Sequence, residues 1–133
     1  MKRVVLDSSA AMAFFENRPG AEKVEELIQF AIQRKRELSM SVVNWGEIYY
    51  SVWRAKGPGL AMKVLSDIAQ LPVELVDVGY DLAKSAAEFH AGYKLPYVDC
   101  FAAALAVQRK AVLATADRDF TQVQKKLDIL WTV

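Results

Sequence analysis

The sequence predicts an α/β protein in which a five-stranded parallel sheet lies between two layers of helices. Short apolar runs rich in β-branched residues recur along the 133 residues, and segments with helical hydrophobic spacing separate them. Strands that alternate with helices favour a parallel sheet with helices on both faces, joined by right-handed crossovers. No repeat, low-complexity segment or linker interrupts this pattern, so we expect one domain over residues 1–133.

The first half of the chain is predicted to supply two strands and four helices. Asp7 or Ser8 is expected to cap the first helix, and Asn44 the third, because Asn, Asp and Ser side chains accept hydrogen bonds from free amides at helix starts. The helix after the Asn17–Gly20 turn is amphipathic, with Val24, Leu27, Ile28 and Ala31 on one face. In order, the predicted elements are a strand (3–7), a helix (8–15), a helix (21–35), a strand (38–43), a helix (45–56) and a helix (60–71).

The second half is predicted to supply three strands and three helices. Pro96 cannot extend a preceding helix but tolerates a helix that begins after it, which places Asp99 in a first helical turn. In order, the predicted elements are a strand (72–78), a helix (81–92), a helix that begins after Pro96, has its apolar stretch at 101–107 and is closed by Arg109 and Lys110, a strand (111–114), a short helix (121–126) and a strand (129–133).

Composition excludes several classes of protein. With 17 basic and 16 acidic residues the net charge is +1, which lacks the strongly basic character of a dedicated nucleic-acid-binding domain. One cysteine, Cys100, and one histidine, His90, cannot form an intrachain disulfide or a zinc site. No apolar run approaches the roughly 18–20 residues of a membrane span, and Asp7 comes too early for a signal peptide. We therefore expect a cytoplasmic protein with no membrane contact.

Four acidic residues are predicted to meet at one edge of the sheet. Asp7 ends the first strand and Asp117 follows the fourth, while Glu47 and Asp99 are expected in first helical turns. Each residue alone also fits a helix-capping or helix-dipole role, with Asn44 to Glu47 matching a capping box. Together, however, these carboxylates would repel one another at the strand ends, where parallel sheets bind ligands. A hard cation such as Mg²⁺ or Mn²⁺ would relieve this repulsion.

At these residues the sequence resembles the PIN-domain ribonucleases, and within them the VapC-like toxins of toxin–antitoxin pairs. The similarity covers essentially the whole chain and rests on Val5–Ser9, Asn44–Glu47, Leu95–Cys100 and Leu113–Phe120. It implies a five-stranded parallel sheet, which agrees with the independent strand count. It also implies that the metal-binding acids are Asp7, Glu47, Asp99 and Asp117, with Asp119 as an additional ligand or turn residue, and that Ser9 and Thr115 are supporting hydroxyls.

The resemblance implies a metal-dependent endoribonuclease, the toxin of a toxin–antitoxin pair. Four acids would hold Mg²⁺ or Mn²⁺, a metal-activated water would cut the RNA, and the products would carry a 5′-phosphate and a 3′-hydroxyl. Basic residues that border the predicted site are candidates for contacts with RNA phosphates. These are Arg18, Arg54, Lys94 and Arg118.

Large apolar residues of the first helices suggest protein partners. We expect a homodimer that also binds a cognate antitoxin, because aromatic residues anchor interfaces; core packing is the alternative for Tyr49, Tyr50 and Trp53. The residues concerned are Met12, Phe14, Phe15, Tyr49, Tyr50 and Trp53.

Two other functions are compatible with acids at a sheet edge. A receiver-like signalling domain would bind Mg²⁺ and accept a phosphoryl group, and Asp77 at the end of the third predicted strand would fit that role, with Thr115 and Ala116 after the fourth. Against it, only one acid follows the first strand. A catalytically inactive PIN-like binding module is the other alternative, which the intact acidic set disfavours.

Overall fold

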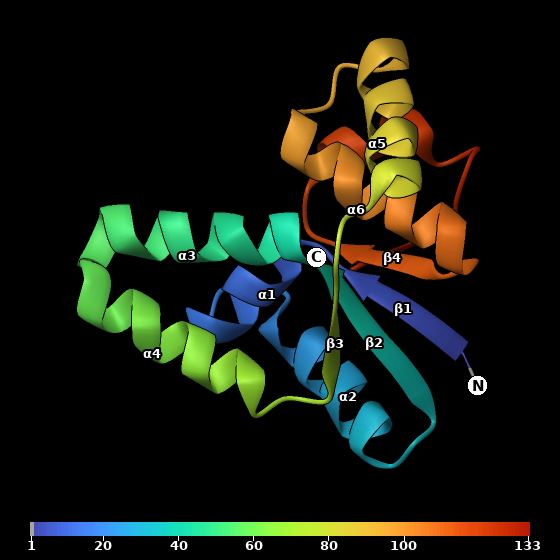
Figure 1. The fold of residues 1–133 in the computed structure, drawn as a ribbon. Coiled ribbons are helices and arrows are strands. Elements are labelled where there is room, and N and C mark those ends of the chain that lie inside the picture. The colour runs from blue at the N-terminus through green and yellow to red at the C-terminus, as the bar shows by residue number, and fades with distance from the viewer. Residues whose placement is uncertain (1) are drawn as a thin grey trace.

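A computed structural model describes residues 2–133, and in it five strands form a single parallel sheet in the order β3-β2-β1-β4-β5 (Figure 1). The predicted three-layer α/β/α class with a five-stranded parallel sheet is confirmed. The strands are β1 (Lys2–Leu6), β2 (Arg36–Ser41), β3 (Val73–Val76), β4 (Val112–Thr115) and β5 (Ile129–Trp131). That a single domain spans residues 1–133 stays a prediction.

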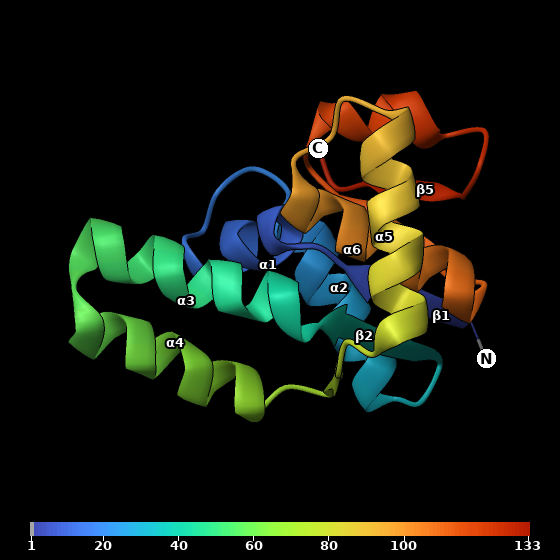
Figure 2. The same cartoon turned by 45° about the horizontal axis from the view of Figure 1, so that its top comes forward.

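Within residues 2–133, six α-helices and one 3₁₀-helix connect and cover the strands. They are α1 (Ser8–Phe15), α2 (Ala21–Ile32), α3 (Val42–Lys56), α4 (Pro58–Ala69), α5 (Tyr80–Gly92), α6 (Tyr97–Arg109) and η1 (Arg118–Val123). Figures 1 and 2 show α3 and α4 as a helical hairpin that projects from one side of the sheet, while α5 and α6 lie together on the opposite side. Within the part of the chain described, no helix is long and apolar enough to cross a membrane.

The core consists of two apolar clusters, one on each face of the sheet. On one face, α1, α2, α3 and α4 pack against the side chains of Val4, Leu6, Leu38 and Met40. On the other face, the small residues of α6 and the buried side of α5 pack against Val5 and Leu113. Because neighbouring residues of a strand point to opposite faces, Val4, Val5 and Leu6 serve the two clusters alternately. Burial on both faces explains the consecutive apolar residues Val4–Leu6 in β1 and Val112–Ala114 in β4.

The predicted start of the third helix is wrong by three residues. Val42 and Val43 read as the end of a β-branched strand, but Ser41 caps α3 by accepting a hydrogen bond from the Asn44 amide at 3.2 Å. Asn44 is therefore inside the first turn and is not the cap, so the expected capping box with Glu47 does not form. Glu47 lies in the second turn of α3 and not in the first.

Other boundaries shift by a few residues for local reasons. The second helix ends at Ile32, and Arg34 then adopts a left-handed conformation with φ of 60°. Pro58 occupies the first position of α4, where its missing amide hydrogen costs nothing. Gly57, with φ of 93°, permits the sharp turn between α3 and α4. The short last helix is the 3₁₀-helix η1, which starts earlier than predicted because Asp117 caps it.

The strand order creates a crevice next to β1. After β1 the chain passes to β2 and β3 on one side, and it returns to β4 and β5 on the other side. Loops that leave neighbouring parallel strands in opposite directions open a gap at the carboxyl edge, where ligands bind in α/β folds. Asp7 follows β1 and Asp117 follows β4, so both carboxylates lie at the crevice between these two strands.

Candidate active site

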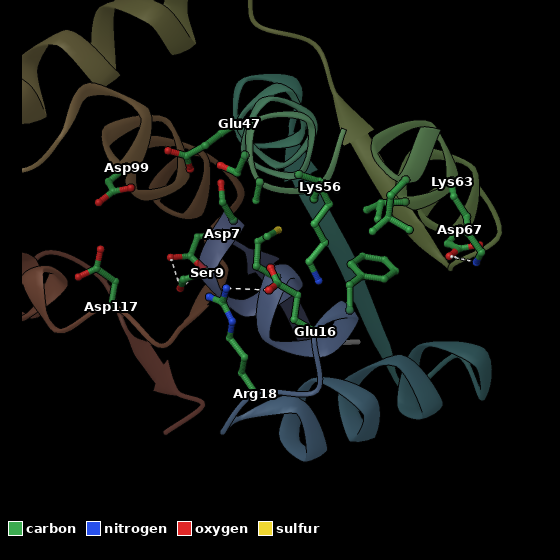
Figure 3. Close-up of a pocket in the computed structure, with 18 of the residues that line it drawn as sticks. Asp7, Ser9, Glu16, Arg18, Glu47, Lys56, Lys63, Asp67, Asp99 and Asp117 are labelled. Carbon is green, nitrogen blue, oxygen red and sulfur yellow. Dashed lines mark hydrogen bonds and ion pairs between the residues drawn. The ribbon is translucent and has the colours of Figure 1, made fainter. Parts of the chain in front are cut away.

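The four predicted acids line one cleft at the carboxyl edge of the sheet. The cleft has a volume of about 620 Å³, and its walls come from α1, α3, α4, the start of α6 and the loop after β4. Asp7, Glu47, Asp99 and Asp117 surround one end of it, as Figure 3 shows. The α3–α4 hairpin forms part of the wall, and apolar side chains also line the cleft, namely Met12, Phe15, Val52, Ala55, Leu60 and Val64. Residues that are far apart in sequence therefore face one shared space.

Asp7 is the most deeply buried and most firmly held of these acids. Its side chain is 2% exposed and caps α1 by accepting a hydrogen bond from the Ala10 amide at 2.9 Å. The Thr115 hydroxyl donates to Asp7 Oδ2 at 2.5 Å, and the Ser9 hydroxyl lies 2.8 Å from Oδ1. Burial raises the pKa of Asp7 to about 6 despite these stabilising donors. The capping interpretation of Asp7 is thus correct, and the same carboxyl group faces the cleft.

Ser9 and Thr115 join Asp7 to the loop that carries Asp117. Thr115 Oγ1 lies 3.2 Å from Ser9 Oγ and accepts a hydrogen bond from the Asp117 amide at 3.0 Å. Ser9 Oγ accepts from the Ala116 amide at 3.1 Å. The two hydroxyls therefore fix the loop after β4 against the start of α1.

Asp99 has the most perturbed acidity in the cleft. It stands in the first turn of α6, as predicted, and is partly buried. Burial raises the pKa of Asp99 to about 7, and the neighbouring carboxylates of Asp117, Asp7 and Glu47 add to this shift. The raised pKa of Asp99 therefore reflects burial first and the negative charge of the neighbouring carboxylates second.

Asp117 caps η1 through a hydrogen bond from the Asp119 amide to its Oδ1 at 2.9 Å. Its carboxyl group also lines the cleft opposite Asp99. Asp119 is exposed and does not line the cleft, so its backbone contacts Asp117 but its carboxyl group does not join the four acids there. Its role as a metal ligand stays a prediction.

Only one of the four predicted RNA-binding residues lies in the cleft. Arg18 borders it and forms an ion pair with Glu16 at 2.7 Å. Arg54, Lys94 and Arg118 lie outside. The Arg54 guanidinium contacts the Tyr50 hydroxyl at 2.8 Å, and that of Arg118 stacks over Trp131 at 4.3 Å. RNA binding by these residues stays a prediction.

Sequence reasoning missed two basic residues of the cleft, Lys56 and Lys63. Lys56 ends α3, and Lys63 lies one turn into α4, where it pairs with Asp67 at 3.0 Å. Both reach the cleft because the α3–α4 hairpin folds back beside α1 (Figure 3). The turn at Gly57 and Pro58 is the one signal in the sequence that could have suggested this placement.

The chemistry of this end of the cleft suits a hard divalent cation. Four carboxylates supply oxygen ligands and negative charge of the kind that Mg²⁺ and Mn²⁺ bind. Within residues 2–133, however, no three Asp, Glu, His or Cys side chains are close enough together to hold a metal ion as they stand. Coordination would therefore require some of these side chains to rotate towards one another.

The geometry disfavours the receiver-like alternative. In such doubly wound domains the third strand lies beside the first, in the order 2-1-3-4-5. Here β2 separates β3 from β1. Asp77, which follows β3, is exposed and borders a different depression together with Gly79, Asp81 and Arg109.

Comparison with known proteins identifies the fold and the family. A family model described as "PIN domain" matches residues 4–126. A search of curated proteins found no match. Among solved structures, the chain resembles DNA-bound VapBC from Salmonella typhimurium, with a TM-score of 0.76 and 17% identity over 100% of both chains. It also resembles VapBC2 from Rickettsia felis bound to a promoter DNA fragment, with a TM-score of 0.74 and 18% identity over 96% of this chain and 97% of that one.

A third similar structure is VapC20 from Mycobacterium tuberculosis, described as a sarcin–ricin loop cleaving toxin. Its TM-score is 0.69 and its identity 18%, over 90% of this chain and 94% of that one. At such low identity these structures support the common fold. The family model spans nearly the whole chain, and therefore the protein belongs to the PIN-domain family.

Proposed function

We propose that the protein is an endoribonuclease that depends on Mg²⁺ or Mn²⁺ and hydrolyses phosphodiester bonds. The observation that carries the proposal is the meeting of four carboxylates, from four separate segments, at one end of a single cleft. PIN-family membership supports a nuclease over other uses of an acidic cleft. The inactive-module alternative is disfavoured because Asp7, Glu47, Asp99 and Asp117 are all present.

Asp7, Glu47, Asp99 and Asp117 are the proposed catalytic and metal-holding residues. A bound Mg²⁺ or Mn²⁺ would lower the pKa of water, orient the phosphate and neutralise charge on the leaving oxygen. Ser9 and Thr115 would keep Asp7 in one orientation through the hydrogen bonds described above. Holding a ligand by a second layer of hydrogen bonds is how proteins tune the sites of such cations.

The basic residues of the cleft are proposed to hold the RNA backbone. Arg18, Lys56 and Lys63 border the same cleft as the acids, so an RNA strand that enters it would contact them through its phosphates. Their positive charge would offset the repulsion between the phosphate backbone and the acidic end of the cleft. Arg54, Lys94 and Arg118 would contact RNA only outside the cleft.

We further propose that the protein is the toxin of a toxin–antitoxin pair and forms a homodimer. A similar structure from Klebsiella pneumoniae is described as a toxin–antitoxin complex, and its fold matches over 98% of both chains. Tyr50 and Trp53 on α3 and Met62 on α4 are exposed apolar side chains that a second protein chain could cover. Co-expression with the product of the adjacent open reading frame tests the pairing, because an antitoxin should relieve growth arrest.

A cleavage assay tests the enzymatic proposal. The purified protein is incubated with an end-labelled RNA in Mg²⁺, in Mn²⁺ or in EDTA, alongside Asp99→Asn and the control Asp77→Asn, which alters an exposed carboxylate outside the cleft. We expect the parent and Asp77→Asn to cut RNA with either metal, and no cleavage in EDTA or by Asp99→Asn. Full activity in EDTA would refute metal dependence, and parental activity of Asp99→Asn would remove Asp99 from the site.

A further inference from the structure

Asn44 is a fully buried amide at the place where three of the segments that carry the cleft acids meet. It lies in the first turn of α3 with 0% of its surface exposed. Its side chain is directed between the start of α1 and the start of α6. A polar side chain in such a position costs stability unless its hydrogen-bonding groups are satisfied.

Each polar group of the Asn44 side chain has a partner. Asn44 Nδ2 donates to Ser8 Oγ at 3.3 Å and to the Val98 carbonyl oxygen at 3.3 Å. Asn44 Oδ1 accepts from Ser41 Oγ at 2.7 Å. In return, the Ser8 hydroxyl donates to the Asn44 carbonyl oxygen at 3.2 Å. One amide therefore connects α1, α3 and α6, which are otherwise separate in sequence.

The partners of Asn44 are the chain neighbours of the acids. Ser8 follows Asp7, Val98 precedes Asp99, and Glu47 lies three residues after Asn44 on α3. We infer that Asn44 is a positioning residue, which sets the relative placement of Asp7, Glu47 and Asp99 through its bonds to Ser8 and Val98. The inference rests on the proposed function, because it assigns Asn44 a role in that site.

Apolar packing alone would not fix this placement. Val43 and Ile48 on either side of Asn44 pack into the two different core clusters, and such contacts tolerate small slides and rotations of a helix. The carboxylates on these segments also repel one another, which pushes the segments apart. Directional hydrogen bonds from a buried amide resist both movements, and buried polar networks are known to rigidify and specify a structure.

A different network holds the fourth acid. Asp117 is connected to Asp7 through Thr115 and Ser9, with no contribution from Asn44. Both hydrogen-bond networks therefore include residues at the start of α1. Loss of Asn44 should disturb the placement of Glu47 and Asp99 relative to Asp7, while the Asp7–Asp117 arrangement should persist.

The experiment uses two substitutions and one control in the full-length protein. Asn44→Leu fills the buried space without donors, and Asn44→Asp keeps the shape and the Ser41 contact but loses the amide donors. Ile48→Val loosens the core one turn later on the same helix, since Ile48 is also 0% exposed. For each protein, thermal melting, the Kd of Mn²⁺ by calorimetry without RNA, and kcat and KM for RNA are measured.

We expect both Asn44 variants to bind Mn²⁺ roughly 10–100-fold more weakly, as is usual when residues behind metal ligands are changed. We expect kcat to fall by about 10–100-fold, because a displacement of about 1 Å in an active site has an effect of this size. KM should change little, since the basic residues of the cleft remain. Ile48→Val should keep the parental Mn²⁺ affinity and kcat even if it melts at a lower temperature.

Two outcomes would overturn the inference, and both differ from failure of the proposed function. A folded Asn44→Leu protein with parental Mn²⁺ affinity and kcat would show that the amide does not position the acids. Losses in Ile48→Val that match those of the Asn44 variants would show a general stability effect. If the parent itself neither binds Mn²⁺ nor cuts RNA, the proposed function fails before the role of Asn44 is considered.

Discussion

At the scale of single residues, the carboxylates of the cleft lie close enough together to repel one another. Burial raises the pKa of Asp99, and the carboxylates of Asp117, Asp7 and Glu47 raise it further. Like charges at close range destabilise a fold unless a counter-charge is present. The folded protein without a cation should therefore be less stable than its core packing alone would suggest.

Removal of the Asp99 charge should not destabilise the metal-free protein. Asp99→Asn keeps the shape of the side chain, so we expect its Tm in EDTA to equal or exceed that of the parent. In millimolar Mn²⁺ the parent should gain stability, since a ligand that binds only the native state shifts the unfolding equilibrium. The variant should gain much less. Equal Mn²⁺ shifts in the two thermal melts would falsify the assignment of Asp99 as a ligand.

The pH dependence of stability should report the same repulsion. The pKa of Asp99 is raised from 3.8 to about 7 in the folded protein, so the folded state binds more protons than the unfolded state between these values. The unfolding free energy should therefore fall as pH rises from about 4 to about 7, and Asp7, with its pKa raised to about 6, adds to this trend. In EDTA, the unfolding free energy of Asp99→Asn, measured by urea melts, should exceed that of the parent by more at pH 8 than at pH 5. An identical pH profile for both proteins would contradict this prediction.

Sequence reasoning located the acids but not their neighbours. Asp7, Asp99 and Asp117 follow strand ends or Pro96, and such positions can be inferred from local patterns alone. Lys56 and Lys63 reach the cleft only through the fold of the α3–α4 hairpin, which no local pattern specifies. Arg54, on the same helix as Lys56, lies outside the cleft, because a difference of two residues turns a helical side chain to another face.

At the scale of elements, the alternation of strands and helices was predictable, and the start of α3 was not. β-branched Val42 and Val43 favour a strand by propensity, but packing decides their state: Val43 packs against the cluster on the α5–α6 side. Ser41 and Asn44 are both good capping residues, but Ser41 is the cap, while the side chain of Asn44 is bonded to Ser8 and Val98 in the interior. Long-range contacts thus settled a boundary that local preference left ambiguous.

The α3–α4 hairpin should contribute to RNA affinity through its lysines. Lys56→Gln and Lys63→Gln remove positive charge from the cleft wall without touching the acids, whereas Arg54→Gln removes the same charge outside the cleft. We expect each lysine variant to weaken RNA binding several-fold and to reduce the slope of log K against log salt by about 0.7–0.9, the value for one phosphate contact. Fluorescence anisotropy in EDTA, where no cleavage is expected, measures both quantities. Equal effects of all three variants would show that the lysines of the cleft contribute no more than a basic residue outside it.

At the scale of the whole molecule, charge and apolar surface are distributed unevenly. The net charge of +1 combines an acidic cluster at one end of the cleft with an excess of basic residues elsewhere. We expect the basic residues to attract an RNA strand and the cleft to orient it. Of the six large residues expected to form a partner surface, four are partly buried against the core, namely Met12, Phe14, Phe15 and Tyr49. Tyr50 and Trp53 remain exposed, by 56% and 46%.

The exposed aromatic residues of α3 belong to a patch that includes α4. Tyr49 packs edge-on against Trp53, with ring centres 5.5 Å apart, and its hydroxyl lies 3.6 Å from the sulfur of Met62, which is 56% exposed. Tyr49 thus links Trp53 to Met62, and exposed Tyr50 lies three residues before Trp53 on the same helix, so the α3–α4 hairpin carries an apolar surface. Because contiguous apolar surface of this kind is uncommon on monomers, it is the best candidate for the proposed dimer interface.

The dimer prediction can be tested by charge insertion into this patch. Trp53→Glu would place a carboxylate in the centre of an apolar interface, where an unpaired buried charge is costly, so we expect the variant to be monomeric at micromolar concentration. Tyr80→Glu is the matched control, because Tyr80 is an aromatic residue that is 97% exposed on α5, away from the hairpin. Light scattering after size exclusion should give a dimer for the parent and for Tyr80→Glu. A parent protein that is only monomeric would refute the dimer, and a dimeric Trp53→Glu would move the interface to another surface.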